Sequence, residues 1–182
     1  MGKYSDNQLL DMFRNAKTRN LAFNQIINQN QERVYWHIRK IVLSHEDAND
    51  IIQNTFIKVW NNLDSFKGDS KIYTWIYRIA TNESLQFLKK KKKHYFESID
   101  NVSSRLSNLL IAERYFDGNE IEKKIQEALL KLPTKQRIAF NMKYFEKMKY
   151  DEISEILGTS VGALKANYHH AKNKIEEFLK EN

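Results

Sequence analysis

The sequence predicts an all-α protein, with two small helical domains joined by a flexible linker. The 182 residues include one proline and five glycines, whereas a sheet built from hairpins needs turn residues about every ten positions. Apolar side chains recur every three or four residues through both halves of the chain, which is typical of amphipathic helices. Hydrophobic residues make up 41% of the chain, enough to form a core in each domain.

Charge divides the chain into three parts. The net charge is +7, with 16 basic and 9 acidic side chains in residues 1–93 and 12 and 9 in residues 121–182. Residues 94–120 hold 2 basic and 5 acidic side chains and mix Ser, Asn, Asp and Gly without a sustained period, as linkers do. We therefore predict domains at 1–93 and 121–182, separated by an acidic linker at 94–120.

The first domain is predicted to be a set of amphipathic helices. Apolar stripes recur along the first 42 residues, and their members, Leu21 among them, are expected to face a core. A helix over 46–63 begins with acidic residues, which the helix dipole favours at that end, and carries a polar face opposite its apolar one. After a loop at 66–70, another helix is expected over 74–88.

The second domain is predicted to end in a helix-turn-helix motif. A helix that begins at residue 121 is stopped by Pro133, and a further helix follows it. Residues 150–157 then form a short helix, Gly158 permits a tight turn, and Ser160 can cap the last helix. This combination is typical of a helix-turn-helix motif, although any tight pair of helices can show it.

The outward face of the last helix fits the major groove of DNA. Small residues lie where the helix approaches the groove closely, and donors for phosphates and base edges surround them. The outward and flanking residues are Gly162, Lys165, Ala166, His169, His170, Lys172 and Asn173. An ordinary solvated helix face is the alternative interpretation.

A second candidate site for nucleic acid lies in the first domain. There the run Lys89–Lys93 extends a helix that contains Tyr73, Trp75, Tyr77 and Asn82. Aromatic rings stack on or wedge between unpaired bases while lysines follow the backbone, so this combination suits single-stranded nucleic acid. A solvated helix end is the alternative for the lysines, and a place in the core is the alternative for Trp75.

Composition and motifs argue against several other classes of protein. There is no cysteine, hence no disulfide or thiolate chemistry. His169 and His170 point about 100° apart on a helix and have no third ligand at helical spacing, so no metal site is expected. Phosphate-binding loops and catalytic motifs are also missing, so we expect neither an enzyme nor a cofactor. We expect a cytoplasmic protein, because no stretch is long and apolar enough to span a membrane and the N-terminus lacks the features of a signal peptide.

Two segments resemble bacterial sigma factors of the extracytoplasmic-function group. Region 2 of that family is similar to HEDANDIIQNTFIKVWNNLDSFKGDSKIYTWIYRIATN and the basic helix after it. Region 4 is similar to LPTKQRIAFNMKYFEKMKYDEISEILGTSVGALKANYHHAKNKI. The resemblance implies a region 2 helical bundle, a region 4 helix-turn-helix domain, and a non-catalytic factor that binds core RNA polymerase, directs it to promoters and melts the −10 DNA. The alternative is a helix-turn-helix regulator that acts without polymerase.

The resemblance also implies which residues bind each partner. Docking on the coiled coil of the beta-prime clamp of core polymerase is implied for Asp47, Asp50, Gln53, Asn54, Thr55 and Lys58, with Phe56 and Trp60 packed beneath. Contact with a flipped base and the melted strand of the −10 element is implied for Phe66, Lys67, Gly68, Asp69, Ser70, Lys71, Trp75, Arg78, Asn82, Lys89, Lys90, Lys91 and Lys92. Contact with the −35 duplex is implied for Lys143, Ser160, Lys165, Ala166, Asn167, His169, His170 and Lys172. The beta flap of the polymerase and an anti-sigma factor are further implied partners.

Several positions depart from the family pattern. Asn49 and Asn54 stand where the family often has acids, and Lys147 stands at a common glycine. Arginine or an aromatic residue is frequent at the positions of Asn167, His169 and His170. Because arginine makes bidentate guanine contacts worth about 1–3 kcal/mol each, we predict weak sequence-specific recognition of the −35 element. Specificity is then left to the −10 pocket or to an additional recruiting factor.

Overall fold

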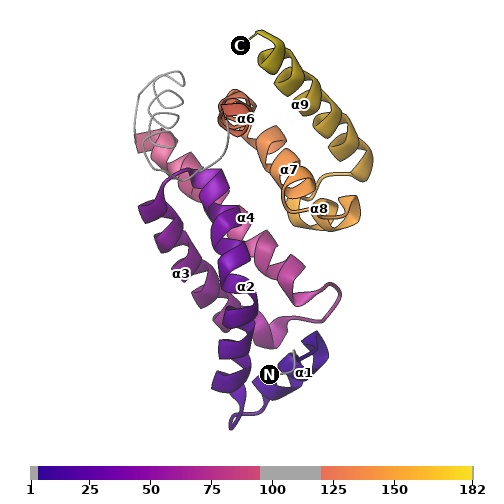
Figure 1. Ribbon diagram of the computed structural model, residues 1–182. Helices are drawn as coiled ribbons and strands as arrows, with labels where there is room; N and C mark the ends of the chain where they lie inside the picture. The colour runs from indigo at the N-terminus through magenta and orange to yellow at the C-terminus, as the bar shows by residue number, and fades with distance from the viewer. Residues whose placement is uncertain (1–3, 95–119, 182) are drawn as a thin grey trace. The chain divides into compact units, whose positions relative to one another are not determined.

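The computed structural model describes residues 4–94 and 120–181 (Figure 1). Within these ranges the regular structure consists of eight α-helices and one 3-10 helix, with no strand. The predicted all-α class is therefore confirmed. Backbone contacts divide the chain into two compact units, Met1–Phe87 and Leu88–Asn182. The predicted linker, residues 94–120, lies almost entirely outside the described residues, so its boundaries stay a prediction.

The first unit is a set of packed helices. In order along the chain these are α1 (Asp6–Arg14), α2 (Arg19–Val42), α3 (His45–Asn62), the 3-10 helix η1 (Leu63–Ser65) and α4 (Ile72–His94), of which residues 72–87 belong to this unit. Helix α2 contacts both α1 and α3, and Figure 1 shows α4 passing behind α2. Their apolar faces meet in a core that includes Leu9, Phe13, Ile26, Val34, Ile38, Ala48, Val59 and Ile76.

Local sequence determines where these helices begin and end. The Ser5 and Ser44 hydroxyls accept backbone N–H bonds from Gln8 and Asp47, each at 3.3 Å, and so cap α1 and α3. Helix α2 ends at Leu43, which has a left-handed φ of 67°. Leucine rarely adopts that conformation, but this side chain is only 5% exposed, so its burial holds the turn that glycine usually makes.

Buried polar contacts tie α4 to α2. A ring nitrogen of His37 lies 2.8 Å from the Thr81 hydroxyl oxygen, and the Tyr77 hydroxyl donates to the Arg33 carbonyl at 3.3 Å. His37, Tyr77 and Thr81 are all 2% exposed or less. Because buried polar groups need partners, these bonds fix how α4 is rotated about its own axis.

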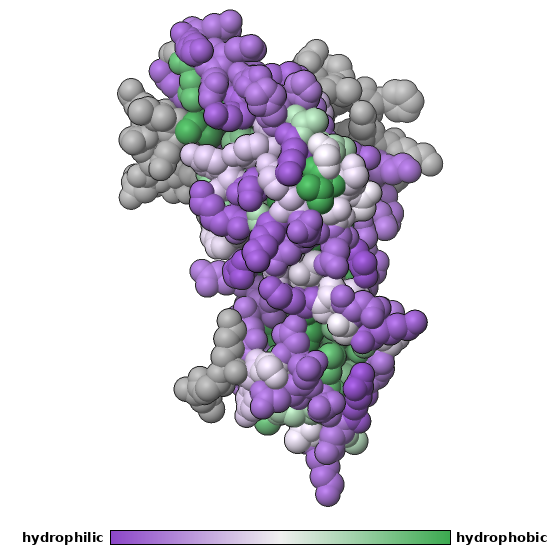
Figure 2. Space-filling view, turned by 90° about the vertical axis from the view of Figure 1, so that its right-hand side faces the viewer, coloured by the Kyte–Doolittle hydropathy of each residue, from purple (hydrophilic) through white to green (hydrophobic). Residues whose placement is uncertain are grey.

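The prediction that Leu21 faces the core is wrong. Its side chain is 50% exposed, whereas the next residue, Ala22, is fully buried. Successive helical positions point about 100° apart, and the second of these two faces the core. Exposed large hydrophobic residues are few among the described residues. On the face drawn in Figure 2, hydrophilic residues predominate.

The second unit contains four described helices: α6 (Glu120–Leu130), α7 (Thr134–Tyr144), α8 (Tyr150–Leu157) and α9 (Val161–Glu181). Helix α9 contacts the other three. One hydrophobic cluster of this unit is formed by Ala128, Leu129, Leu132, Phe140, Ala171 and Ile175. Pro133 separates α6 from α7 as predicted, since proline fits the start of a helix but not its interior. No described helix is long and apolar enough to cross a membrane.

Candidate polymerase and nucleic-acid interfaces

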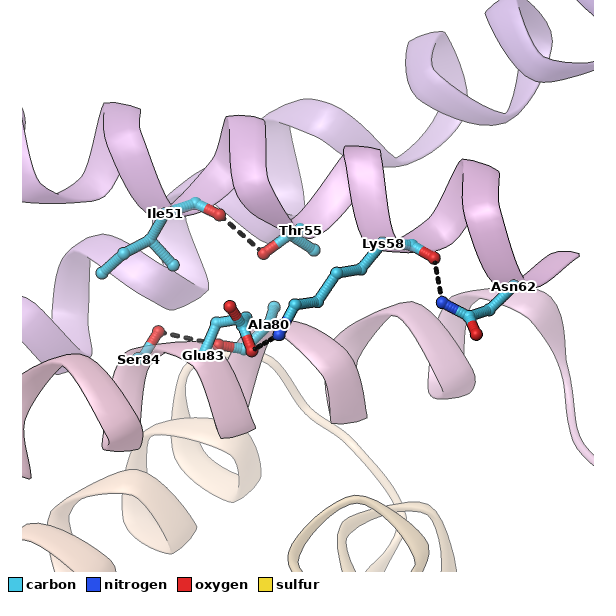
Figure 3. Close-up of polar contacts among 7 residues, drawn as sticks. All are labelled: Ile51, Thr55, Lys58, Asn62, Ala80, Glu83 and Ser84. Atoms are coloured by element: carbon cyan, nitrogen blue, oxygen red, sulfur yellow. Dashed lines mark hydrogen bonds and ion pairs between the residues drawn. The ribbon is translucent and has the colours of Figure 1, made fainter.

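The predicted docking residues lie on the outer side of α3. Asp50, Gln53 and Asn54 are exposed and Asp47 is half-buried. Lys58 is exposed as well, but its ammonium reaches across to α4 and pairs with the Glu83 carboxylate at 2.5 Å (Figure 3). The ammonium is therefore held by a partner within the first unit.

Thr55 does not belong to this surface. Its side chain is fully buried and its hydroxyl donates to the Ile51 carbonyl at 2.7 Å (Figure 3). The assignment of Thr55 to the docking surface is therefore wrong, because the residue falls in the apolar stripe of α3. Phe56 is buried as predicted, and the Trp60 ring packs on Phe23 with ring centroids 4.9 Å apart.

Ile57 was missed by the sequence analysis. It is 58% exposed, the highest exposure among the large hydrophobic residues that the structure describes. It lies three and four positions after Asn54 and Gln53, hence on the same face of α3. An isoleucine at this spacing within a run of polar residues could have been recognised from the sequence as an exposed apolar side chain.

In the predicted −10 loop, one aromatic residue is part of the core. Phe66 is 8% exposed and Trp75 is 9% exposed, and their ring centroids lie 5.0 Å apart. Both rings are thus buried in this structure, which favours the alternative of a place in the core for Trp75, and contact with DNA stays a prediction for both residues. The remaining loop residues are exposed or, for Ser70, half-buried: Lys67, Gly68, Asp69, Ser70 and Lys71.

The shape of this loop depends on Gly68 and on a bond to α1. Gly68 has a φ of 80°, a left-handed conformation that favours glycine. The backbone N–H of Ile72, where α4 begins, donates to the Asp6 carboxylate at 2.8 Å. The loop is thus held at the end that leads into α4.

Helix α4 presents a polar stripe to solvent. Arg78, Asn82 and Lys89 are exposed, and their spacings of four and seven residues place them on one face. Gln86 is exposed on the same face, which the sequence analysis did not single out. Ala80, Thr81 and Ser84 are buried on the other side, so Asn82 has to point outward. Lys90 and Lys91 are exposed, and the side chain of Lys92 lies outside the described residues.

Helices α8 and α9 form the predicted helix-turn-helix arrangement. Gly158 has a φ of 61°, and its N–H donates to the Ser154 carbonyl at 2.9 Å. The Ser160 hydroxyl accepts the Ala163 N–H at 3.3 Å and so caps α9, as predicted. The apolar side of α9 is buried through Leu164, Ala171 and Ile175.

The predicted −35 residues of α9 lie on its outer side. Lys165, Ala166, His169, His170 and Lys172 are exposed, and Asn167 is half-buried. Two of these side chains have partners along the helix. A His169 ring nitrogen lies 3.3 Å from the Asn173 amide nitrogen, and the Lys172 ammonium lies 3.4 Å from the Glu176 carboxylate.

Lys143 is less available than the sequence implied. It is half-buried, its ammonium donates to the Met148 carbonyl at 3.1 Å, and it lies 4.7 Å from the centre of the Tyr150 ring. Burial, and then the neighbouring Tyr168, raises the pKa of Tyr150, so its phenol is neutral at physiological pH. Lys143 therefore supports the start of α8.

Helix α7 carries a buried cation. Arg137 on α7 is 9% exposed, and its burial lowers the pKa of the guanidinium to about 10. It is therefore still charged at neutral pH. Among the described residues, no three His, Cys, Asp or Glu side chains gather in a way that could hold a metal ion.

Family comparisons match both units. The family model described as Sigma-70 region 2 matches residues 26–94, and the model described as Sigma-70, region 4 matches residues 122–175. The ECF RNA polymerase sigma factor SigW of Bacillus subtilis (strain 168) is 30% identical over 168 residues, covering 88% of this chain and 90% of that protein. The ECF RNA polymerase sigma-E factor of Haemophilus influenzae is 28% identical over 166 residues, covering 87% of each.

A solved structure has the same fold. The sigma factor RpoE from Bartonella quintana, in complex with the anti-sigma factor NepR, is similar with a TM-score of 0.69 at 23% sequence identity. The match covers 87% of this chain and 96% of that one. The resemblance found in the sequence is thus confirmed, and the chain belongs to the ECF family of RNA polymerase sigma factors.

Proposed function

We propose that this chain acts as an alternative sigma factor that binds core RNA polymerase, directs it to specific promoters and melts the −10 region. The observation that carries the proposal is the presence, in one chain and in this order, of matches to region 2 at 26–94 and region 4 at 122–175. A helix-turn-helix regulator that works without polymerase needs only the second match. The first unit would then have no role.

Docking on the beta-prime clamp coiled coil is assigned to the exposed face of α3. Asp47 and Asp50 give its first turns a negative charge. Gln53 and Asn54 then offer amides, and Ile57 adds an exposed apolar side chain. Since Lys58 is paired with Glu83, the later part of this face carries little net charge. We expect apolar and amide contacts to contribute more there than charge does. The second unit docks on the beta flap.

Melting of the −10 element is assigned to the loop before α4 and the polar stripe along α4. A base that leaves the stack costs a few kcal/mol of unstacking free energy, and a preformed loop offsets part of that cost. Asn82 offers an amide for hydrogen bonds to the flipped base. Arg78 and Lys89–Lys91 are exposed on the same helix and neutralise the phosphates of the melted strand.

Recognition of the −35 element is assigned to α9. Its exposed polar residues include histidines and lysines but no arginine, so bidentate guanine contacts are missing. Sequence recognition by this helix is therefore weak. The −10 pocket or a recruiting factor supplies the rest of the promoter specificity.

The other partners follow from the family. The RpoE structure holds an anti-sigma factor, and we propose that a protein of that class inhibits this chain. The chain has no catalytic activity of its own in this proposal. It works in the cytoplasm, at the nucleoid when active, because core polymerase and promoters are there.

Run-off transcription from a promoter library tests the proposal. Core polymerase is assayed with and without the full chain, and binding to core is measured in parallel by co-purification. Transcripts that require the chain are expected, with a common sequence at the −10 position. Core binding without transcripts would indicate that a recruiting partner is missing, whereas failure to bind core would refute the sigma assignment.

A further inference from the structure

Four lysines gather around the start of α8. The Lys143 ammonium donates to the Met148 carbonyl at 3.1 Å and lies 4.7 Å from the centre of the Tyr150 ring. The Lys165 ammonium, from α9, lies 5.9 Å from the centre of the same ring. Lys147 and Lys149 flank Met148 in sequence, and both are exposed. We call Lys143, Lys147, Lys149 and Lys165 the lysine cluster.

Lys147 and Lys149 stand at backbone positions where other residue types are more stable. Lys147 has a φ of 55°, in the left-handed region that suits glycine. Lys149 immediately precedes α8, where Ser, Thr, Asp or Asn would cap the helix with a side-chain oxygen. A lysine side chain has no acceptor for that bond. Positions that break local rules are expected at functional sites.

Exposed lysines outnumber exposed acids around this turn. The Glu152 carboxylate accepts the Lys149 backbone N–H at 3.0 Å and so helps to cap α8. One carboxylate oxygen of Glu146 is buried. Asp151 is the exposed acid of the stretch from Lys143 to Glu152. The lysine cluster therefore presents net positive charge to solvent.

We propose that Lys147 and Lys149, together with Lys165, bind the phosphates of duplex DNA beside the groove that α9 enters, while Lys143 adds its positive charge beside the start of α8. This inference rests on the proposed function, since it assumes that α9 approaches a duplex. Phosphate contacts supply affinity and register but no sequence information. They suit a motif whose helix α9 exposes no arginine, because affinity then comes from the backbone while α9 recognises bases weakly.

Duplex binding by the full chain at different salt concentrations tests this inference. Fluorescence anisotropy is measured with two labelled duplexes, one with a −35 element and one with a scrambled sequence, between 50 and 200 mM KCl. Lys147→Gln and Lys149→Gln are each expected to lower the slope of log K against log salt by about 0.9. The ratio of wild-type to variant affinity then falls about 3.5-fold over this fourfold range of salt. The ratio is expected to be the same for both duplexes.

Lys135→Gln is the matched control. Lys135 is exposed at the start of α7, the far end of that helix from the lysine cluster, and its replacement removes the same charge. We expect it to leave the slope unchanged. Asp151→Asn should strengthen binding to both duplexes, because it removes a negative charge beside the cluster.

Three results would overturn the inference. The first is an unchanged slope of log K against log salt for both Lys147→Gln and Lys149→Gln. The second is a fall in that slope for Lys135→Gln as large as for these two variants. The third is no measurable duplex binding by the wild-type chain at 50 mM salt. Co-purification with core polymerase is measured on the same proteins and decides the proposed function separately. If the cluster variants lose core binding while their slopes stay unchanged, the lysines bind polymerase and the DNA assignment is wrong.

Discussion

Replacing Trp75 with alanine is expected to lower the free energy of unfolding of the first unit by about 3–5 kcal/mol. The Trp75 side chain is only 9% exposed, and its ring packs on Phe66 with centroids 5.0 Å apart. Removing the indole leaves a cavity beside the Phe66 ring. For a urea dependence of about 2 kcal/mol per molar, the midpoint of unfolding falls by about 2 M.

Tryptophan fluorescence observes this change in the first unit alone. All three tryptophans of the chain lie within residues 1–87, so Trp36 and Trp60 still report on that unit in the variant. Trp75→Phe keeps an aromatic ring against Phe66 and is expected to shift the midpoint less. A different result would refute this reasoning. If the urea midpoint of Trp75→Ala stays within about 0.3 M of the wild type and the variant loses only promoter opening, the indole contacts DNA and does not stabilise the first unit.

The coupling between the two rings provides a second measure. A double-mutant cycle with Phe66→Leu and Trp75→Leu is expected to give an interaction free energy of about 0.5–1.5 kcal/mol, which is typical of packed aromatic pairs. A coupling near zero would show that the two rings do not stabilise each other.

Three further variants separate binding residues from structural ones. Ile57→Ser should change stability by less than about 0.5 kcal/mol, because the side chain is 58% exposed, yet weaken core binding at least about fivefold in a titration. Asn82→Ala should alter base preference at the flipped position more than total affinity, and an unchanged preference in a randomised promoter library would contradict the pocket. Lys149→Ser supplies a cap for α8 and should raise the free energy of unfolding of the second unit by about 0.5–1 kcal/mol. Hydrogen exchange of α8 in the full chain measures that gain, and unchanged exchange would show that the cap is not needed.

The helices and the helix-turn-helix motif could be predicted from the sequence because their signals are local. Pro133 marks the end of one helix, and Gly158 and Ser160 mark a tight turn and a cap. Each acts within a few residues of its own position. The structure shows the left-handed glycine and the capping hydroxyl at those positions. Repeating apolar positions likewise predicted which face of α9 is buried.

Burial and pairing that the sequence did not reveal depend on contacts between distant parts of the chain. Phe66 follows η1 in sequence, but its partner Trp75 lies in the next helix, so sequence position alone makes it look like part of an exposed loop. Lys58 was assigned to a polar face, yet Glu83 on α4 holds its ammonium. Thr55 shows a different difficulty, because threonine fits either face of a helix when its hydroxyl can bond to the carbonyl four residues earlier.

The turn between α7 and α8 separates what stabilises the fold from what binds a partner. The left-handed conformation of Lys147 costs about 1–2 kcal/mol. Glycine would avoid that cost but would lose about 0.4–1 kcal/mol, because it has more freedom in the unfolded chain. Relative to glycine at position 147 and a capping serine at position 149, the two lysines therefore cost about 1–2 kcal/mol in total. That is a sizeable share of the 5–15 kcal/mol that typically stabilises a domain. Lys147→Gly and Lys149→Ser should therefore stabilise the second unit and weaken duplex binding together. A gain in stability with no loss of DNA affinity would mean that the charge of these lysines has no part in binding.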